Sequence, residues 1–489
     1  MENMLVGREK EISKLEDVFN STQAEFVAVY GRRRVGKTFL IKQFFEKKEV
    51  VFFEQTGLHK GTLKEQLNLF SESLGKAFYQ GAKMSILKNW MEAFKQLSSA
   101  MDNIPKAKRI TLFFDELPWL STPRSGFLKA FEHYWNTDWC YRKKLILIVC
   151  GSAASWMIEK LIYAKGGLHN RITVTIPLRP FTLKETALYL SAFDKNPSQK
   201  QILQLYMVTG GVAHYLRAVK KGLSATQNID RLCFQHGGFL LDEFDKLFRS
   251  LYEDAETYIK IVRVIAKNTG GISREKLISS LRKISSGGTL NNKIKSLEEA
   301  GFISTFIPLG HTKRGVYYRV IDEYVLFYLA WIEPFRKNSR GDTPEDGHHW
   351  SNQIHTPAYY AWAGYAFEAV CFKHIGQIKK ALGLDQISCG YGDWRYSPIS
   401  TQDQGTQIDL LFDRDDDCVT ICEIKNTDKP FSVTKEYAKD LENKKRIYVN
   451  QTRTSKLILM ALISNKGAVE NNYYKKIFSN CVTTEDLFK

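Results

Sequence analysis

Two glycines, a lysine and a threonine are spaced in residues 31–38 as a polyphosphate site requires. The segment reads GRRRVGKT, with Gly31 and Gly36 bounding a turn that ends in Lys37 and Thr38. Backbone N–H groups of such a loop wrap the phosphates of a nucleotide, the lysine reaches the β- and γ-phosphates, and the threonine hydroxyl ligates Mg²⁺. The sequence therefore predicts a site for ATP and Mg²⁺. The other candidate nucleotide contacts in the loop are Arg32, Arg33, Arg34 and Val35.

The segments on either side of this loop have the character that the chemistry needs. Residues 25–30, EFVAVY, form an apolar run typical of a strand, and residues 39–48, FLIKQFFEKK, have helical spacing. A helix that begins at the loop adds its positive dipole end to the anion site. The complete motif with both flanks argues against the alternative, a plain glycine turn between a strand and a helix.

An acidic pair and a serine follow two further apolar runs. RITLFFDELPWL (109–120) ends its apolar stretch in Asp115 and Glu116. In a nucleotide hydrolase the first carboxylate holds Mg²⁺ and the second orients or deprotonates the attacking water. KLILIVCGSAAS (144–155) ends in Ser152, which could sense the γ-phosphate or cap the next helix. Both roles of Ser152 stay open at this point.

The composition is that of a soluble protein with several domains. The chain has 489 residues, 44% hydrophobic and 25% charged, which predicts two to four domains with cores of their own. The net charge of +17 favours an anionic partner such as nucleic acid. The eight cysteines are scattered without a CxxC pair, as expected for reduced thiols in the cytoplasm. No apolar run approaches the roughly 20 residues of a membrane helix, and no signal-peptide core follows the N-terminus. We therefore expect no membrane partner.

The first half of the chain alternates strand-like and helix-like segments. Residues 1–180 predict an α/β fold, a parallel sheet covered by helices that forms a P-loop ATPase core. Residues 181–250, with segments such as FTLKETALYLSAF, predict an all-helical lid.

The middle of the chain predicts a winged helix-turn-helix over residues 251–332. Three helical segments precede two strand-like runs that flank HTKRG, a candidate wing with Lys313 and Arg314 at its tip. The third helix, residues 289–300, would be the recognition helix, and its Lys293 and Lys295 are compatible with DNA phosphates. Contact with DNA and a purely protein-binding role remain equally open. The polar segment 333–353 predicts a linker.

A second group of chemically competent residues lies in residues 354–489. Glu368 falls in a helix-like stretch, Asp409 begins an apolar strand, and CVTICEIKNT carries Glu423 and Lys425 with one residue between them. Because side chains alternate along a strand, Glu423 and Lys425 share one face. The run DRDDD (413–417) predicts a hairpin turn that brings Asp409 and Glu423 together.

Carboxylates in this arrangement suit divalent metal chemistry on a phosphodiester. Asp409 and Glu423, with Glu368 in support, can hold one or two Mg²⁺ ions that polarise the phosphodiester and generate hydroxide. Lys425 can position the water or neutralise developing charge. The alternative is an exposed charged hairpin. The order of these residues, followed by the helix-like segment 432–445, resembles the restriction-endonuclease-like fold with its D…E-x-K signature.

Taken together, the motifs resemble the archaeal-type P-loop ATPases, AAA-like proteins related to signalling ATPases. The resemblance implies an additional-strand ATPase core, a helical lid, a winged helix-turn-helix and a C-terminal restriction-endonuclease-like α/β domain. By position it implies that Val6, Gly7 and Arg8 line the adenine pocket, and that Arg171 or Arg179 contacts the γ-phosphate, in cis or in trans. The motifs that carry it are LVGRE (5–9), GRRRVGKT (31–38), FFDELPWL (113–120), GSAASWM (151–157), LRPF (178–181) and GGVAHYL (210–216).

These observations predict an ATP-hydrolysing protein whose C-terminal domain is a metal-dependent nuclease acting on DNA. The state of the bound nucleotide would gate that domain, possible settings being defence or control of mobile elements. One alternative is a regulatory ATPase whose C-terminal domain binds nucleic acid or protein without cleaving it. Another is a ring-forming homo-oligomeric motor.

Overall fold

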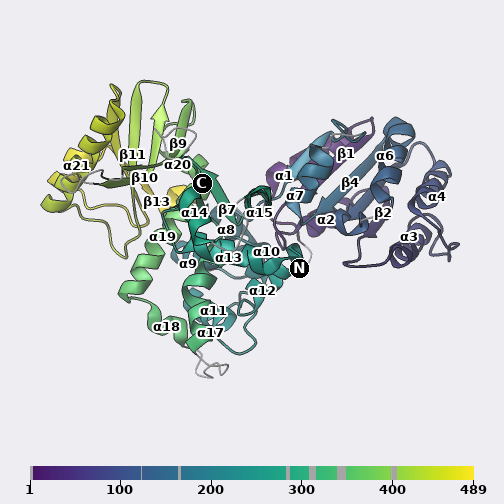
Figure 1. Cartoon of the computed structure of the whole chain (residues 1–489), viewed down its shortest axis with the longest axis horizontal. Coiled ribbons are helices and arrows are strands. Elements are labelled where there is room, and N and C mark those ends of the chain that lie inside the picture. Colours follow the sequence, from purple (N-terminus) through teal and green to yellow (C-terminus); the bar gives the residue numbers. More distant parts are fainter. Residues whose placement is uncertain are drawn as a thin grey trace. The chain divides into compact units, whose positions relative to one another are not determined.

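The computed structural model of the chain divides into two compact units (Figure 1). The first unit comprises Met1–Pro180, Val212–His214 and Lys295–Gly301. The second comprises Phe181–Gly211, Tyr215–Ile294 and Phe302–Lys489. The structure describes residues 4–122, 124–163, 167–281, 287–307, 315–338, 348–396, 398 and 405–489.

A parallel five-stranded sheet forms the centre of the first unit. The strand order is β2-β3-β4-β1-β5, with β4 inserted between β1 and β3. All the neighbouring strands are parallel, so their carboxyl ends meet at one edge of the sheet. This topology confirms the predicted P-loop NTPase fold. The strands are β1 (Glu25–Tyr30), β2 (Val50–Thr56), β3 (Arg109–Asp115), β4 (Leu145–Gly151) and β5 (Val174–Pro177).

Helices cover both faces of this sheet (Figure 1). Helices α1 (Glu9–Asn20) and α2 (Lys37–Glu46) pack on one face through residues such as Leu15 and Ile41. Helices α3 (Leu63–Phe78), α4 (Trp90–Asp102) and α6 (Phe127–Thr137) pack on the other. The shorter elements of the unit are α5 (Leu117–Leu120), a 3₁₀ turn (Trp139–Tyr141), α7 (Ala154–Met157) and a π-helical turn (Ile158–Ile162).

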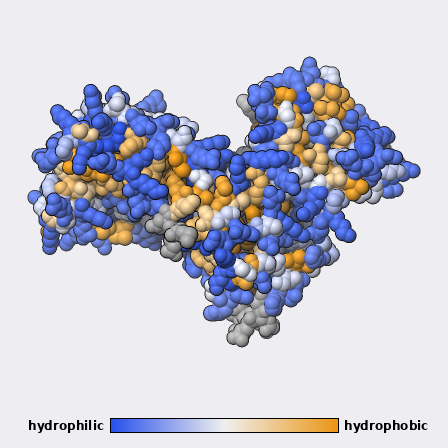
Figure 2. Space-filling view, turned by 180° about the vertical axis from the view of Figure 1, so that it is seen from behind, coloured by the Kyte–Doolittle hydropathy of each residue, from blue (hydrophilic) through white to orange (hydrophobic). Residues whose placement is uncertain are grey.

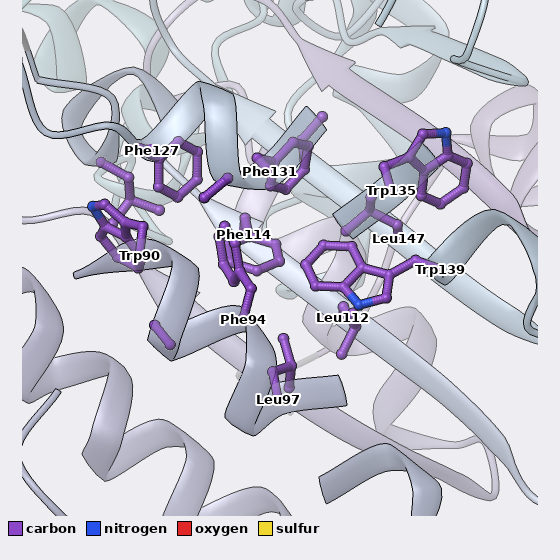
Figure 3. Close-up of a cluster of buried hydrophobic side chains, with 14 of the residues drawn as sticks. Trp90, Phe94, Leu97, Leu112, Phe114, Phe127, Phe131, Trp135, Trp139 and Leu147 are labelled. Atoms are coloured by element: carbon purple, nitrogen blue, oxygen red, sulfur yellow. The ribbon is translucent and has the colours of Figure 1, made fainter. Parts of the chain in front are cut away.

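The second of these faces holds an aromatic core that fixes the end of β3 (Figure 3). Phe114 of β3 packs edge-on against Phe131 with ring centroids 5.5 Å apart, and Phe94 meets Trp139 at 5.2 Å. Each fully buried ring contributes on the order of 2 kcal/mol by leaving water. Because Phe114 directly precedes Asp115, this packing holds the acidic pair in place.

The chain is helical between residues 181 and 251, all of which belong to the second unit except Val212–His214. Three helices begin at hydroxyl caps, where Thr182, Ser198 and Ser224 accept a hydrogen bond from the backbone N–H three residues later. This agrees with the predicted all-helical segment. The helices are α8 (Leu183–Ala192), α9 (Gln199–Thr209), α10 (Ala213–Arg217), α11 (Ala225–Cys233) and α12 (Glu243–Leu251).

Three helices and a small antiparallel sheet follow, as a winged helix-turn-helix requires. The sheet order is β6-β8-β7. Lys293 of the third helix pairs with Asp254 at 2.9 Å and lies over the Tyr258 ring, so an internal contact occupies its ammonium group. The wing tip, Lys313 and Arg314, lies outside the described residues. The elements are α13 (Ala255–Ala266), β6 (Ile272–Ser273), α14 (Arg274–Ser280), α15 (Gly288–Glu299), β7 (Ile303–Phe306) and β8 (Tyr317–Val320).

Residues 333–353 were expected to form a linker, but helices occupy both ends of this segment. The prediction of irregular structure is wrong at those two ends. Helix α16 (Glu323–Phe327) and a π-helical turn (Tyr328–Ile332) lead into α17 (Glu333–Asn338), and α18 spans His349–Gln353. Trp350 is buried, and its backbone N–H donates to Asp230 Oδ1 at 2.6 Å. Such tertiary contacts order a segment whose polar composition alone would predict irregular structure. Residues 339–347 lie outside the described part of the chain.

A mixed five-stranded sheet forms the C-terminal domain, in the order β13-β12-β11-β10-β9. Strands β9, β10 and β11 are antiparallel, whereas β11, β12 and β13 are parallel. This is the expected C-terminal α/β domain. Its elements are α19 (Pro357–Lys373), α20 (Ile375–Ala381), β9 (Cys389–Tyr396), β10 (Thr406–Arg414), β11 (Cys418–Lys425), α21 (Lys435–Thr452), β12 (Leu457–Ser464), α22 (Asn472–Ile477), β13 (Asn480–Thr483) and α23 (Thr484–Leu487).

Hydrophilic residues predominate on the face of the molecule in Figure 2, with hydrophobic residues in patches between them. Over the described ranges, no helix has the length and apolar character needed to cross a membrane. All eight cysteines are free thiols.

Candidate functional site

The loop between β1 and α2 depends on two glycines for its shape. Gly31 has φ 145°, and a Cβ atom there would lie 2.2 Å from the carbonyl oxygen of Leu178. Gly36 has φ 98° at the start of α2. The loop therefore runs against the end of β5 in a backbone conformation that side chains do not tolerate. A backbone cradle of this kind fits the phosphates of a nucleotide.

Lys37 lies in the first turn of α2 and is buried. Its Nζ atom donates to the carbonyl oxygens of Gly31 (2.9 Å) and Arg32 (3.0 Å), and to the Ser152 hydroxyl (3.1 Å). Burial lowers the pKa of Lys37, because a desolvated ammonium group is disfavoured. The ammonium group is thus folded back along the loop, where the phosphates of a nucleotide would meet it.

Thr38 and Asp115 place two oxygen ligands side by side. The Thr38 hydroxyl donates to Asp115 Oδ2 at 2.7 Å. Asp115 is the last residue of β3, and its carboxylate is buried. A hydroxyl and a carboxylate are oxygen ligands of the kind that Mg²⁺ prefers. The donor set at the carboxyl edge of this sheet therefore fits the predicted ion.

Glu116 and Ser152 are joined at the same edge. The Ser152 hydroxyl donates to Glu116 Oε1 at 2.6 Å, and the Ser152 N–H donates to Oε2 at 3.1 Å. Since Lys37 donates to the same hydroxyl, Ser152 links the lysine with the acid. These contacts favour a role for Ser152 inside the site over a role as a helix cap. Glu116 has a positive φ of 47°.

The segment before α1 is tied to the phosphate loop by Arg8. Its guanidinium is buried and donates to the carbonyl oxygens of Arg179 (2.6 Å) and Val35 (3.1 Å). Arg8 and Gly7 both have positive φ, 65° and 67°. Arg8 therefore joins the loop to the chain that follows β5. Lining of the adenine pocket by Val6, Gly7 and Arg8 stays a prediction.

Three arginines predicted at the nucleotide site differ in their surroundings: Arg33 of the loop, and Arg171 and Arg179, the candidates for the γ-phosphate. Arg33 acts electrostatically on Lys37 and Arg179 on Tyr30, which ends β1. Arg171 is exposed, in a turn where its N–H donates to the Leu168 carbonyl at 3.2 Å. The arginine that completes the site, Arg171 or Arg179, stays a prediction.

The second group of residues gathers on the β10–β11 hairpin. Leu410 pairs with Cys422, so the preceding Asp409 lies across from Glu423. The Nζ atom of Lys425 lies 2.9 Å from Glu423 Oε1, which confirms that this pair shares one face of β11. On β10 the pairing with β9 is irregular between Ile408 and Leu411, so the strand departs from its regular register at Asp409.

Two residues of α21 also contact Glu423, and neither was predicted from the sequence. Lys444 Nζ lies 2.6 Å from Glu423 Oε2, and the Tyr437 hydroxyl donates to Oε1. Lys425 also lies over the Tyr437 ring, 5.1 Å from its centroid. Tyr437 and Lys444 are seven residues apart, two turns on one helix face. That spacing, in a helix directly after the E-x-K strand, was the available signal.

The carboxylates of this site influence one another's ionisation. Burial, and then the Asp409 charge, raise the pKa of Glu368 to about 8. Burial and Glu423 raise the pKa of Asp409 to about 6. Burial acts to raise the pKa of Glu423 as well, but the ammonium groups of Lys444 and Lys425 outweigh it and lower that pKa. Glu368, on α19, thus belongs to the same electrostatic neighbourhood as the hairpin.

The described residues of this site are not arranged to hold a metal ion. Among the described side chains, no group of three or more His, Cys, Asp or Glu residues could bind one. Both oxygens of Glu423 are engaged, one by Lys444 and the other by Lys425 and Tyr437. The expectation that the carboxylates meet within reach of one ion is therefore not met. Metal binding by Asp409 and Glu423 stays a prediction.

Comparison with known proteins gives a consistent result for the first half of the chain. Residues 5–219 match the model of an ATPase domain found predominantly in Archaea. An uncharacterized protein of Methanocaldococcus jannaschii is 27% identical over 465 residues, 93% of this chain and 92% of the relative. An uncharacterized ATP-binding protein of the same organism is 49% identical over 47 residues, 10% of this chain and 80% of the relative.

Solved structures with overall similarity have low sequence identity. The Walker-type ATPase of Pyrococcus abyssi has a TM-score of 0.46 and 18% identity, covering 66% of this chain and 96% of its own. The Aeropyrum pernix ORC2 protein, solved as ADPNP–ADP complexes, has a TM-score of 0.41 and 14% identity, covering 70% of this chain and 98% of its own.

Proposed function

We propose that the first unit binds ATP with Mg²⁺ and hydrolyses the bond between its β- and γ-phosphates, because residues 5–219 match the model of an ATPase domain found predominantly in Archaea. The observation that carries the proposal is the meeting of Lys37, Thr38, Asp115, Glu116 and Ser152 at the carboxyl edge of one parallel sheet. These residues supply a cation, two oxygen ligands, a carboxylate base and a hydroxyl.

Each of these residues has a distinct task in the proposed reaction. Lys37 exchanges its carbonyl partners for the β- and γ-phosphates, and Thr38 with Asp115 would hold Mg²⁺. A bound Mg²⁺ would neutralise charge that develops on the phosphates. Glu116 orients the attacking water and accepts its proton. Ser152 contacts both Lys37 and Glu116, so it holds the acid at a set position relative to the lysine.

The test separates nucleotide binding from hydrolysis. Lys37→Met removes the phosphate-binding cation and should abolish ATP binding, measured with a fluorescent ATP analogue. Glu116→Gln should keep binding but lose turnover by at least about 100-fold, because only the base is removed. Turnover close to that of the unaltered protein in Glu116→Gln would overturn the assignment of Glu116. An exposed glutamate on α3 is the control: Glu72→Gln should leave both binding and turnover unchanged.

A second proposal concerns the C-terminal domain, which we infer acts on DNA as a metal-dependent nuclease. It is supported by the convergence of Asp409, Glu423 and Lys425 on one hairpin, with Glu368 near them. In this structure the Glu423 carboxylate is paired with the ammonium groups of Lys425 and Lys444. A domain that binds nucleic acid or protein without cleaving it is the alternative.

An assay for cleavage of plasmid and single-stranded DNA by the full chain distinguishes a nuclease from a domain that binds without cleaving. The assay compares Mg²⁺, Mn²⁺ and no metal, each with and without ATP. Cleavage that Glu423→Ala abolishes would establish a nuclease, and a further loss in Lys37→Ala would show that ATP gates it. ATP turnover without cleavage under any condition would instead favour a regulatory ATPase. Assembly into a ring on addition of ATP would favour the motor.

A further inference from the structure

We propose that a pocket at the carboxyl ends of β11 and β12 holds one unpaired nucleobase of a DNA strand. The inference rests on the proposed action of the C-terminal domain on DNA, and it involves no metal. Asn426, which directly follows Lys425 at the end of β11, and Asn465, which directly follows β12, both line the pocket. The two strands are parallel, and ligands of open α/β sheets bind at the carboxyl ends of such strands.

The charges of the pocket favour a neutral ligand. Among the described residues that line it, the two charged ones are Lys200 of α9 and Asp428, and they pair with each other at 3.4 Å. Asp428 also accepts a hydrogen bond from the Tyr360 hydroxyl at 2.9 Å. A phosphate would meet this carboxylate beside the ammonium group and be repelled by it. A nucleobase carries no charge and meets no such repulsion.

Two amides in the lining offer unlike hydrogen-bonding groups. Asn426 Nδ2 donates to the Ala363 carbonyl at 3.0 Å, and Asn465 Oδ1 accepts the N–H of Thr427 at 2.8 Å. These contacts use the donor of one amide and the acceptor of the other. Within the described part of the chain, Asn426 Oδ1 and Asn465 Nδ2 have no hydrogen-bond partner, so an acceptor and a donor remain for a ligand. The edge of a nucleobase presents both kinds of group.

Apolar and aromatic side chains in the lining suit the flat faces of a base. Leu203 and Met207 of α9 are buried, and so is Tyr359, whose ring packs edge-on against Trp350 with centroids 5.7 Å apart. Tyr360, next along α19, is 43% exposed. Bases stack on aromatic rings of this kind whatever their sequence.

The size of the pocket and the position of the base in DNA indicate a single unpaired base. The pocket has about 360 Å³ of empty space, open solvent included, which is at the lower end of the range for small-ligand sites. Within a duplex the neighbouring bases cover both faces of a base, and its partner covers the hydrogen-bonding edge. A base must therefore be outside the stack before these side chains can contact it.

The experiment compares the binding of the full chain to two labelled duplexes by fluorescence anisotropy, in EDTA and without nucleotide. One duplex carries a single bulged thymidine, and the other carries an abasic residue at the same bulge, so the two differ by one base. The unaltered protein should bind the thymidine duplex at least about fivefold more tightly, which is the lower end of the effect of one stacked base.

Two lining residues can be changed with matched controls. Tyr360→Leu removes an exposed ring and should abolish the preference, whereas Tyr360→Phe keeps the ring and should retain it. Asn465→Asp loses the Nδ2 donor but can still accept the Thr427 N–H, and it should reduce the preference. Asn472→Asp adds the same charge at an exposed position of α22 and should leave the preference unchanged. Circular dichroism melts check that each variant is folded.

Free thymidine, titrated into the full chain by calorimetry, tests the other source of a nucleobase. In the proposed arrangement the DNA strand delivers the base, so the free nucleoside should bind far more weakly than the bulged duplex. Thymidine binding that Tyr360→Leu removes, together with equal affinity for the two duplexes, would assign the pocket to a free nucleoside and overturn the role of DNA.

The outcomes also separate this inference from the proposed nuclease. Equal affinity of the unaltered protein for the two duplexes would overturn the inference and leave the nuclease standing. A preference that survives in Tyr360→Leu, or that Tyr360→Phe loses equally, would overturn it as well. The expected pattern would support the pocket even if the chain cleaves no DNA. Absence of binding to either duplex would reject both this inference and the action on DNA.

Discussion

Six residues in and beside the phosphate loop have a positive φ. Non-glycine residues in this conformation cost about 1 kcal/mol or more each, and they persist where surrounding contacts hold them. Here the contacts include the bonds of Arg8 to two carbonyls and those of Glu116 to Ser152. These contacts therefore hold the unfavourable backbone conformations of the proposed nucleotide site in place. The residues concerned are Gly7, Arg8, Gly31, Arg34, Gly36 and Glu116.

We predict that Gly31→Ala disrupts the nucleotide site and destabilises the first unit. The new Cβ would lie 2.2 Å from the Leu178 carbonyl oxygen, at a φ of 145°. We expect the free energy of unfolding to fall by at least about 2 kcal/mol and ATP binding to be lost. Urea unfolding and binding of a fluorescent ATP analogue measure the two effects.

Gly81→Ala provides the matched control for that substitution in the same unit. Gly81 also has a positive φ, 85°, but nothing lies within 4 Å of the added methyl group. Its cost should be about 1 kcal/mol from backbone strain alone, with ATP binding intact. An equal effect of the two substitutions would show that close packing on Leu178 does not matter.

At the scale of single residues, the motifs could be predicted from the sequence. The residues of other elements that contact those motifs could not. Spacing alone assigned Lys37 and Thr38 to the phosphate-binding motif, at the start of α2, and put Glu423 on the same face as Lys425, because both patterns depend on local geometry. The contact of Lys444 with Glu423 joins residues 21 positions apart. It depends on how α21 packs on the sheet, which no local pattern specifies.

Among the elements, α19 combines several contacts of the second unit. Lys373 at its end pairs with the buried Glu323 of α16, and His374 Nε2 accepts the N–H of Leu183, the first residue of α8. Near its middle, the Ala363 carbonyl accepts from Asn426, which directly follows β11. Helix α19 and the residue that follows it therefore contact three parts of the second unit: the end of β11, α16, and α8 of the helical segment after the ATPase core.

We predict that His374 makes the stability of the second unit depend on pH. Burial lowers the pKa of His374 to about 4, against 6.5 for an unperturbed histidine; Lys373 and Glu185 are the charged groups acting on it. The unfolded chain therefore binds the proton more tightly between these values. Stability is fully present above pH 6.5 and falls as the pH drops toward 4, by at most about 3 kcal/mol.

His374→Gln isolates this contribution, because glutamine can accept the Leu183 N–H without titrating. Urea unfolding of both proteins at pH 7.5 and pH 5 gives the difference in the free energy of unfolding. We expect the advantage of the unaltered protein over the variant to shrink at pH 5. A constant difference at both pH values would contradict the assignment.

The expected linker shows where prediction of elements fails. The polar sequence EPFRKN suggested irregular structure, yet it forms α17 because Phe335 is buried against Phe234 with ring centroids 5.2 Å apart. The alternation of strands and helices in the ATPase core was predictable from periodicity. Order imposed by distant aromatic partners was not.

For the whole molecule, net charge is the property most directly tied to a partner. A charge of +17 favours anionic polymers, and each phosphate contact releases counter-ions. We predict that affinity for a labelled DNA duplex falls roughly 1000-fold between 50 and 200 mM salt, measured by fluorescence anisotropy. Binding that is independent of salt would show that the positive charge does not serve DNA.

The contacts at the end of α19 also limit where the chain can be truncated if the C-terminal domain is to be expressed alone. A polypeptide starting at residue 354 would retain the sheet and both carboxylate strands. It would lack Glu323 and Leu183, and so leave the charge of Lys373 and the ring of His374 without their partners. Such a truncation would expose a surface that the full chain covers, and aggregation of the fragment would say little about the catalytic competence of the domain.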